Sequence, residues 1–392
     1  MKISQIPIPD HFQRLSRVVH AARMDARPQP TITPTLASTT ELILRHGYMY
    51  ASVVQWHPTT AILATDDQWW YPDGTLLSPV DPRGRFGRWD ATGRYGAYLD
   101  IYHADGCSHR VTVCDLHTQR CWELADPAIT HFLFHPARPE VTVLTKHGIY
   151  QWQIGDESGA LLIDVVCDDY QQPAWSATGS HFSLMAPNPR TGPGHRTCTL
   201  WVWDATGVLL TTMSLTHWHI TSYFRLITPF WHPTQPYFVT YHENTLIWWN
   251  RAMTIHTIQP LAESGGGSDQ PLEWSPDGTA LLVVSDRQVI LFDAVGTLVH
   301  RYESPSGDGV QSITWHPSGH WFAAGYWDST IVIWSLAGQV EQTITTADRP
   351  DSSGTPFMLR WDPTGTFFAA GLRSYLVNVY RATVADGEVI AP

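Results

Sequence analysis

A short phrase returns eight times along this chain: an aromatic residue, a polar residue, usually a proline, and then a turn. The intervals between successive phrases are 33, 45, 41, 56, 43, 41 and 46 residues, close to the roughly 40 to 50 residues that one four-stranded propeller blade occupies. This repeat predicts an all-β fold built of blades. A chain of this length would ordinarily form about two or three domains, but a closed array of repeats can form one larger domain. The phrases begin at Trp56, Trp89, Phe134, Trp175, Trp231, Trp274, Trp315 and Trp361.

The sixth repeat shows most clearly which residues are expected to form the four strands of one blade. Strands are expected at 271–274, 280–284, 288–293 and 297–301, and the Pro and Gly within 275–278 favour a tight reversal after the first strand. Such a meander, with strands a to d from the centre outward, cannot bury both faces alone, so neighbouring blades must stack and the ring must close. We expect the aromatic residue of each phrase to fill the gap between successive blades. The prediction is a closed β-propeller of eight four-stranded blades, with seven as the alternative because the first interval is the shortest.

Two stretches carry a resemblance to a known family. The seventh repeat reads Ala-Gly-Tyr-Trp-Asp-Ser-Thr-Ile-Val-Ile-Trp over 324–334, and the fourth ends its third strand with Trp203-Asp204. On these residues the chain resembles the WD40-repeat propellers over about 46–392, although most other blades replace the Trp-Asp pair. The resemblance implies a non-catalytic scaffold or adaptor that binds a protein or peptide within a larger assembly. Composition and spacing themselves predict only the fold.

Ring closure requires an outer strand for the last blade, since an open ring would expose an edge that pairs with other chains. The segment 41–45, just before the first blade, is placed to supply this strand, and 387–390 is the competing candidate. We divide the chain into an N-terminal extension, 1–38, and the propeller, 39–392.

The N-terminal extension has a pattern different from the blades. Apolar residues that include Phe12 and Leu15 recur there at helical spacing, Asp10 is placed as a cap, and prolines at 28–34 end the pattern. This predicts a short amphipathic helix followed by a Pro-rich linker. The helix either packs on this same propeller or is reserved for the groove of a partner.

Charge and composition exclude several classes of protein. The net charge of −12 argues against direct binding to nucleic acid, because a phosphate backbone requires a concentrated basic face. A subunit of a nucleic-acid-handling complex, held there by protein contacts, is a weaker alternative. No segment approaches the roughly 18 apolar residues of a membrane span, and the start lacks the apolar run of a signal peptide. We expect a soluble, cytoplasmic protein without membrane contact, whose propeller is monomeric.

The cysteines and the missing catalytic motifs argue against a disulfide framework and against an enzyme. The five cysteines are an odd number without a CxxC motif, which favours reduced thiols. The sequence has no GxSxG, no phosphate loop and no HExxH, so we expect no enzymatic activity and no cofactor. The rival hypothesis is a propeller enzyme, of hydrolase or lyase type, or a small-ligand binder that uses the central channel. Three or more His, Asp or Glu directed inward from different blades would favour that rival.

Two groups of residues contain side chains that can bind a metal. His217 and His219 are spaced to project from one face of a strand, but a structural zinc needs four ligands and no third or fourth has a recognisable spacing. Cys107, His109 and Cys114 form a second group, for which packing in the core or rim is the better interpretation. The sequence therefore predicts no metal site.

The loops between strands b and c and between strands d and a lie on the same face of a propeller, here called the loop face. Interface anchors are enriched in Trp, Tyr and Arg. For Trp327 and Asp328 the alternative is a role inside their own blade, and for His242 and Glu243 it is a solvated turn. The predicted partner-binding residues, on the loop face and the N-terminal helix, are Phe12, Arg14, Leu15, Arg17, Arg196, Trp218, His219, Tyr223, Arg225, His242, Glu243, Trp327, Asp328 and Arg373.

Overall fold

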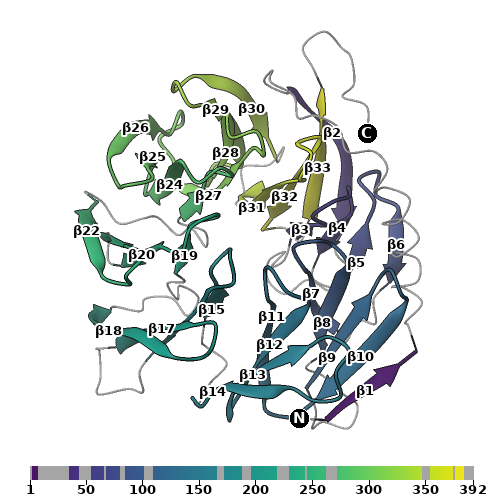
Figure 1. Cartoon of the computed structure of the whole chain (residues 1–392). Coiled ribbons are helices and arrows are strands. Elements are labelled where there is room, and N and C mark those ends of the chain that lie inside the picture. The colour runs from purple at the N-terminus through teal and green to yellow at the C-terminus, as the bar shows by residue number, and fades with distance from the viewer. Residues whose placement is uncertain are drawn as a thin grey trace.

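The computed structural model describes residues 2–7, 35–43, 54–65, 68–79, 84–100, 109–165, 172–187, 196–218, 229–242, 245–261, 272–346, 354–373 and 376–383. These residues form eight antiparallel sheets arranged around a ring, and no α-helix occurs among them (Figure 1). The predicted all-β propeller with eight blades is confirmed. The helix predicted around Asp10 and Leu15 lies outside the described residues.

The first four blades follow the chain in order. Blade 1 consists of β3 (Val54–Trp56), β4 (Leu63–Thr65), β5 (Gln68–Trp70) and β6 (Leu76–Pro79). Blade 2 consists of β7 (Gly84–Trp89), β8 (Tyr95–Asp100), β9 (Arg110–Asp115) and β10 (Arg120–Ala125). Blade 3 consists of β11 (Ile129–Phe134), β12 (Glu140–Thr145), β13 (Gly148–Gln153) and β14 (Ala160–Ile163). Blade 4 consists of β15 (Gln172–Trp175), β16 (His181–Pro187), β17 (Arg196–Asp204) and β18 (Leu209–Trp218).

The remaining blades repeat the same meander. Blade 5 consists of β19 (Phe230–Trp231), β20 (Phe238–His242), β21 (Thr245–Trp249) and β22 (Ile255–Pro260). Blade 6 consists of β23 (Leu272–Trp274), β24 (Ala280–Ser285), β25 (Gln288–Asp293) and β26 (Leu298–Glu303). Blade 7 consists of β27 (Val310–Trp315), β28 (Trp321–Tyr326), β29 (Thr330–Ser335) and β30 (Val340–Thr345). Blade 8 consists of β31 (Pro356–Trp361), β32 (Phe367–Leu372), β33 (Leu376–Thr383) and an outer strand from the N-terminal part of the chain.

That outer strand is β2 (Thr35–Ile43), which closes the ring. It pairs antiparallel with β33, so that Thr35 lies opposite Thr383 and Ile43 opposite Leu376. The prediction from 41–45 is thus confirmed as far as residue 43, although the strand begins six residues earlier than expected. The competing segment 387–390 lies outside the described residues.

A further N-terminal strand was not predicted. β1 (Lys2–Ile6) adds a fifth strand to blade 2 by pairing antiparallel with β10. Ile3 lies opposite Leu124 and packs against the apolar core between blades 2 and 3. Both β1 and the first part of β2 belong to the sequence segment 1–38, and both are built into propeller sheets.

The tryptophans of the repeated phrase join neighbouring blades, as expected. Indole N–H groups reach back to the preceding blade: Trp315 donates to the carbonyl oxygen of Glu273 at 3.0 Å, and Trp274 donates to that of Phe230 at 3.0 Å. Trp56 of blade 1 donates to the carbonyl oxygen of Arg360 in blade 8 at 3.1 Å, across the point where the ring closes. These three wedges therefore combine apolar burial with a hydrogen bond between blades, whereas the indole nitrogens of Trp89 and Trp361 are buried without a hydrogen-bond partner.

The turns that follow the phrase alternate between two kinds. Blades 1, 3, 5 and 7 carry histidine after the aromatic residue, whereas blades 2, 4, 6 and 8 carry Asp or Ser followed by a turn-closing glycine with positive φ. In the even blades the Asp or Ser side chain accepts the amide hydrogen five residues later, as in the 2.7 Å bond from Tyr95 N to Asp90 Oδ1. The ring is thus a fourfold array of two-blade units.

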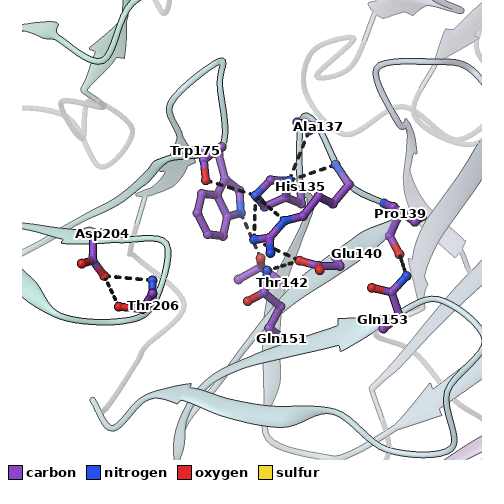
Figure 2. Close-up of polar contacts among 12 residues, drawn as sticks. His135, Ala137, Pro139, Glu140, Thr142, Gln151, Gln153, Trp175, Asp204 and Thr206 are labelled. Carbon is purple, nitrogen blue, oxygen red and sulfur yellow. Dashed lines mark hydrogen bonds and ion pairs between the residues drawn. The ribbon is translucent and has the colours of Figure 1, made fainter.

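Each of these histidines lies against the turn of the next blade. Nε2 of His57, His135 and His232 lies 3.0, 3.1 and 2.8 Å from the carbonyl oxygens of the glycines closing the turns of blades 2, 4 and 6. Nδ1 accepts a backbone amide of the histidine's own turn, for His135 the amides of Ala137 and residue 138 (Figure 2). In His57 and His232, Nδ1 accepts the amides of Thr59 and Thr234, so the ring proton of the neutral imidazole sits on Nε2 and is donated across the blade boundary. At His135, Nε2 also accepts from the Arg138 guanidinium at 3.3 Å. We call these contacts the His–Gly contacts; His316 and Gly365 form the fourth, by close packing.

Acidification should destabilise the ring through these histidines. Burial lowers the pKa of His316 to about 4, and burial together with the Arg138 guanidinium lowers the pKa of His135 to about 4, from an ordinary 6.5. The unfolded chain binds more protons between about pH 6.5 and 4, so stability falls as the pH falls through that window, by on the order of 3 kcal/mol for each group. Burial also raises the pKa of Glu273 to about 7, and this carboxyl has the opposite effect between its unfolded value of 4.5 and 7.

Burial also raises the pKa of Asp362, which acts like Glu273, and lowers the pKa of His181 and His232, which act like His135 and His316. The four histidines outnumber the two carboxyls. We expect the urea midpoint at pH 5 to lie below that at pH 7.5, and His316→Gln to reduce this difference. Replacement of the exposed His256 by Gln is the matched control and should leave the difference unchanged. A midpoint that rises on acidification would contradict the assignment.

The expectation of reduced thiols is wrong for one pair of cysteines. Cys114 and Cys121 lie directly opposite each other on β9 and β10, and a disulfide joins them in the core. Sequence spacing did not reveal the pair, because only the hairpin register brings the two side chains face to face. His109 contacts the carbonyl oxygen of Ile129 and Cys114 is in the disulfide, while Cys107 lies outside the described residues.

Candidate interaction surface

The loop face of blades 6 to 8 is held together by a chain of backbone contacts. The amide of Val310 donates to the carbonyl oxygen of Asp286 at 2.7 Å, and the amide of Trp327 donates to that of Gly309 at 3.0 Å. The hydroxyl of Thr355 then donates to the carbonyl oxygen of Trp327 at 3.2 Å, and the amide of Arg373 donates to that of Thr355 at 3.1 Å. Loops of three consecutive blades are therefore fixed relative to one another.

Trp327 and Arg373 meet on this fixed surface. Trp327 lies in the b-to-c turn of blade 7, and Arg373 lies in the corresponding turn of blade 8. The guanidinium carbon of Arg373 lies 4.5 Å from the centre of the indole ring, within the range of a cation–π contact. On the other side, a Cβ added at Gly309 would lie 2.9 Å from the indole, so the ring packs directly on that backbone. Both side chains remain partly exposed.

Asp328 has a role inside its own turn. Its Oδ1 accepts the amide of Thr330 at 3.0 Å and the hydroxyl of Thr330 at 2.6 Å. Ser329, the next residue, has φ of 65° and is buried, so the carboxylate stabilises a turn that contains a left-handed residue. The alternative of a structural role thus applies to Asp328, while Trp327 presents its ring beside it.

Of the other predicted anchors, the described structure brings one pair together. Arg196 begins β17 and Trp218 ends β18, and the two residues lie opposite each other in the register of these strands. His242 ends β20. The side chains of these three residues are not described. The remaining predicted residues lie outside the described part of the chain: Phe12, Arg14, Leu15, Arg17, His219, Tyr223, Arg225 and Glu243.

On the described inner strands, Glu273 of β23 and Arg360 of β31 carry opposite charges that attract each other. Glu273 on β23 accepts hydrogens from the hydroxyl of Thr314 at 3.3 Å and the amide of Trp315 at 3.2 Å, both on β27. Burial raises the pKa of the Glu273 carboxyl and lowers that of the Arg360 guanidinium, while the attraction between the two opposes both shifts. Among the residues that the structure describes, no three His, Cys, Asp or Glu side chains come together in a group that could hold a metal.

The family model described as WD domain, G-beta repeat matches residues 296–335. This match begins before β26 and ends with β29, so it covers the outer strand of blade 6 and the three inner strands of blade 7. The same offset explains why β2, which precedes blade 1, completes blade 8. Residues 296–335 thus match one WD40 repeat, within a β-propeller of eight blades. A search of the curated proteins gives no significant match to it.

WD40 propellers are commonly scaffolds for interactions between proteins and typically have no enzymatic activity. In this propeller, the described residues contain no helix of the length and apolar character needed to traverse a membrane.

Proposed function

We propose that this WD40 propeller is a non-catalytic scaffold whose loop face binds a protein or peptide partner in a larger assembly. The observation that carries the proposal is the Trp327–Arg373 pair, an indole and a guanidinium held at 4.5 Å on loops that hydrogen bonds fix in place. Trp and Arg are the residues most often found as energetic anchors of interfaces. Because the pair is already ordered, a partner would not have to supply the free energy of ordering it.

Charged side chains surround the Trp327–Arg373 pair, as in the polar rim of a protein interface. Arg287 and Asp308 are exposed on neighbouring loops of the same face, and Asp286 lies within 3.8 Å of the Arg287 guanidinium. A partner that covers the indole would meet both signs of charge around it. Such an arrangement favours a specific protein or peptide surface over a uniformly charged ligand.

Co-purification from native cells tests the proposal. The tagged wild-type chain should retain a partner in stoichiometric amount, and the double variant Trp327→Ala/Arg373→Ala should lose it by at least about tenfold, as expected for hot-spot anchors. The exposed Leu336, on the opposite end of blade 7, supplies the matched control Leu336→Ala, which should retain the partner. Equal retention by all three chains, or no partner with the wild type, would contradict the proposal.

A second set of variants in the same co-purification experiment tests whether the N-terminal segment contributes to binding. We propose that Phe12 and Leu15, with Arg14 and Arg17, add a second contact to the partner. Phe12→Asp/Leu15→Asp, which leaves β1 and β2 intact, should then weaken co-purification, and unchanged recovery would defeat this part alone. We propose the cytoplasm as the compartment. The Cys114–Cys121 disulfide is the observation that counts against this proposal, because disulfides persist mainly in oxidising compartments. A tagged chain found in such a compartment would contradict it.

A further inference from the structure

The residue just before each repeated phrase occupies the same position in all eight blades. It lies on the first strand of its blade, one step before the aromatic wedge, as Arg360 lies opposite Ala369 and Trp361 opposite Phe368 in blade 8. The same register holds in the other seven blades. These eight side chains therefore lie at one level of the propeller, and we call them the inner ring.

The inner ring is polar on one side and apolar on the other. Blades 6, 7, 8, 1 and 2 contribute the polar members, which are Glu273, Thr314, Arg360, Gln55 and Arg88. Blades 3, 4 and 5 contribute the apolar members Leu133, Ala174 and Phe230, which are partly exposed. Two arginines and one carboxylate give the inner ring a net charge of +1, within a chain whose net charge is −12.

Contacts between blades join these positions around the centre of the propeller. First strands of neighbouring blades lie side by side there: β19 and β23, β23 and β27, β27 and β31, and β31 and β3 (Figure 1). The indole N–H groups of Trp56, Trp274 and Trp315 each donate to the carbonyl oxygen of the inner-ring residue in the preceding blade. The Glu273 carboxylate reaches in the other direction, to the hydroxyl of Thr314. The members of the inner ring are thus fixed relative to one another from blade 5 to blade 1.

Glu273 balances one of the two arginines. Its carboxylate and the Arg360 guanidinium attract each other, and Nη1 of Arg360 donates to the carbonyl oxygen of Leu359 at 2.7 Å. Both charged side chains keep part of their surface exposed. Within the described part of the chain, Oε2 of Glu273 has no hydrogen-bond partner. Its negative charge would repel an anion from this side of the centre.

Arg88 is the other arginine, and it lies on the opposite side, because blades 2 and 6 face each other in a ring of eight. Its guanidinium carbon lies 5.9 Å from the centre of the Phe132 ring in blade 3, where the apolar side begins. The side chain is exposed, yet burial lowers the pKa of its guanidinium. Both hold where protein surrounds a side chain that still borders solvent. No carboxylate of the described residues forms an ion pair with Arg88, so its charge is not balanced by them.

We propose that the centre of the propeller binds a small organic anion, whose carboxylate or phosphate group pairs with Arg88 and whose apolar part lies against Leu133 and Ala174. A guanidinium offers two parallel N–H donors to either oxyanion, and partial removal of water strengthens the attraction between the charges. The neighbouring Gln55 side chain can donate to the same group. Glu273 on the far side orients the ligand, since it repels the anionic end.

Calorimetric titration of the full-length chain at constant ionic strength tests this proposal. The probes are phenylphosphate and phenylacetate, with inorganic phosphate and benzyl alcohol as comparisons. We expect one site that binds an organic anion at least about tenfold more tightly than either comparison, because inorganic phosphate lacks the apolar part and benzyl alcohol lacks the charge. The tighter of the two organic anions shows whether the group is a phosphate or a carboxylate.

Variants of the inner ring locate the site. Arg88→Gln should weaken binding of the organic anion at least about tenfold, and Arg88→Lys should retain part of the affinity, because it keeps the charge without the planar pair of donors. Glu273→Gln should tighten binding, because it removes the negative charge on the far side. The matched control is Arg287→Gln, at an exposed arginine of the loop face, and it should bind like the wild type.

This site does not depend on the function proposed for the loop face. The double variant Trp327→Ala/Arg373→Ala should bind the organic anion like the wild type, whether or not it loses a protein partner. Equal binding by Arg88→Gln and the wild type, equal affinity for benzyl alcohol and the organic anions, or weaker binding by Glu273→Gln would each overturn the proposal. The same holds for an equal loss with Arg287→Gln, which would indicate a nonspecific effect of charge, and for no binding of either organic anion.

Discussion

Gly278→Ala is expected to lower the free energy of unfolding by about 3 kcal/mol or more, a large effect for one methyl group. Gly278 closes the turn of blade 6 with φ of 76°, a conformation that costs an alanine about 1 to 2 kcal/mol. A Cβ added there would also lie 2.3 Å from Cε1 and 2.4 Å from Nε2 of His232. The imidazole would have to move, which breaks its 2.8 Å hydrogen bond to the Gly278 carbonyl oxygen.

Gly319 provides the control for this substitution. It has φ of 73°, and an added Cβ would meet no atom within 4 Å. Gly319→Ala should therefore report only the backbone strain of about 1 to 2 kcal/mol. Urea unfolding of both variants, completed by His232→Ala and the double variant with Gly278→Ala, isolates the coupling across the blade boundary. Equal losses for the two glycines, or no coupling to His232, would show that the His–Gly contact does not constrain the ring.

Trp315→Ala is expected to cost about 3 to 5 kcal/mol. Trp315 is 4 % exposed and packs in the core shared by blades 6 and 7. Its indole N–H donates to the carbonyl oxygen of Glu273, so the alanine variant loses a bond between blades and leaves a cavity. Among the tryptophans, Trp327 supplies the comparison, because its ring lies on the loop face and is partly exposed.

The two tryptophan variants should separate stability from binding. Trp327→Ala should lose less unfolding free energy than Trp315→Ala while losing the partner, because the Trp327 ring is partly exposed and leaves no enclosed cavity. Trp315→Ala should mainly lower the free energy of unfolding. Similar unfolding midpoints for the two variants would contradict the wedge role of the repeated phrase.

The repeated phrase predicted the blades because each one needs the same aromatic wedge and the same reversal. Ring closure by the segment before blade 1 followed from the need to cover the last edge. The alternation of histidine with Asp or Ser was visible in the eight phrases, yet its meaning depends on which turn lies next in space. The contact of His232 with Gly278 spans 46 positions in the sequence, and no local pattern encodes it.

Other features depended on register or packing and could not be predicted. The five residues of β1 are too few to distinguish an added strand from a loop, and only the pairing with β10 defines them. The Cys114–Cys121 disulfide likewise requires the hairpin register. For the candidate site, composition singled out Trp327 and Arg373, but their contact arises from loops of two different blades.

Closure of the eight-bladed ring by β2 is the claim on which the surfaces described above depend, and two truncated chains test it most directly. The chains lack residues 1–34 and 1–43, so they differ only in β2, and their thermal unfolding midpoints are compared. The account predicts that the longer truncation unfolds at least about 5 °C lower and tends to aggregate, because blade 8 loses its outer strand. Identical midpoints for the two chains would contradict it.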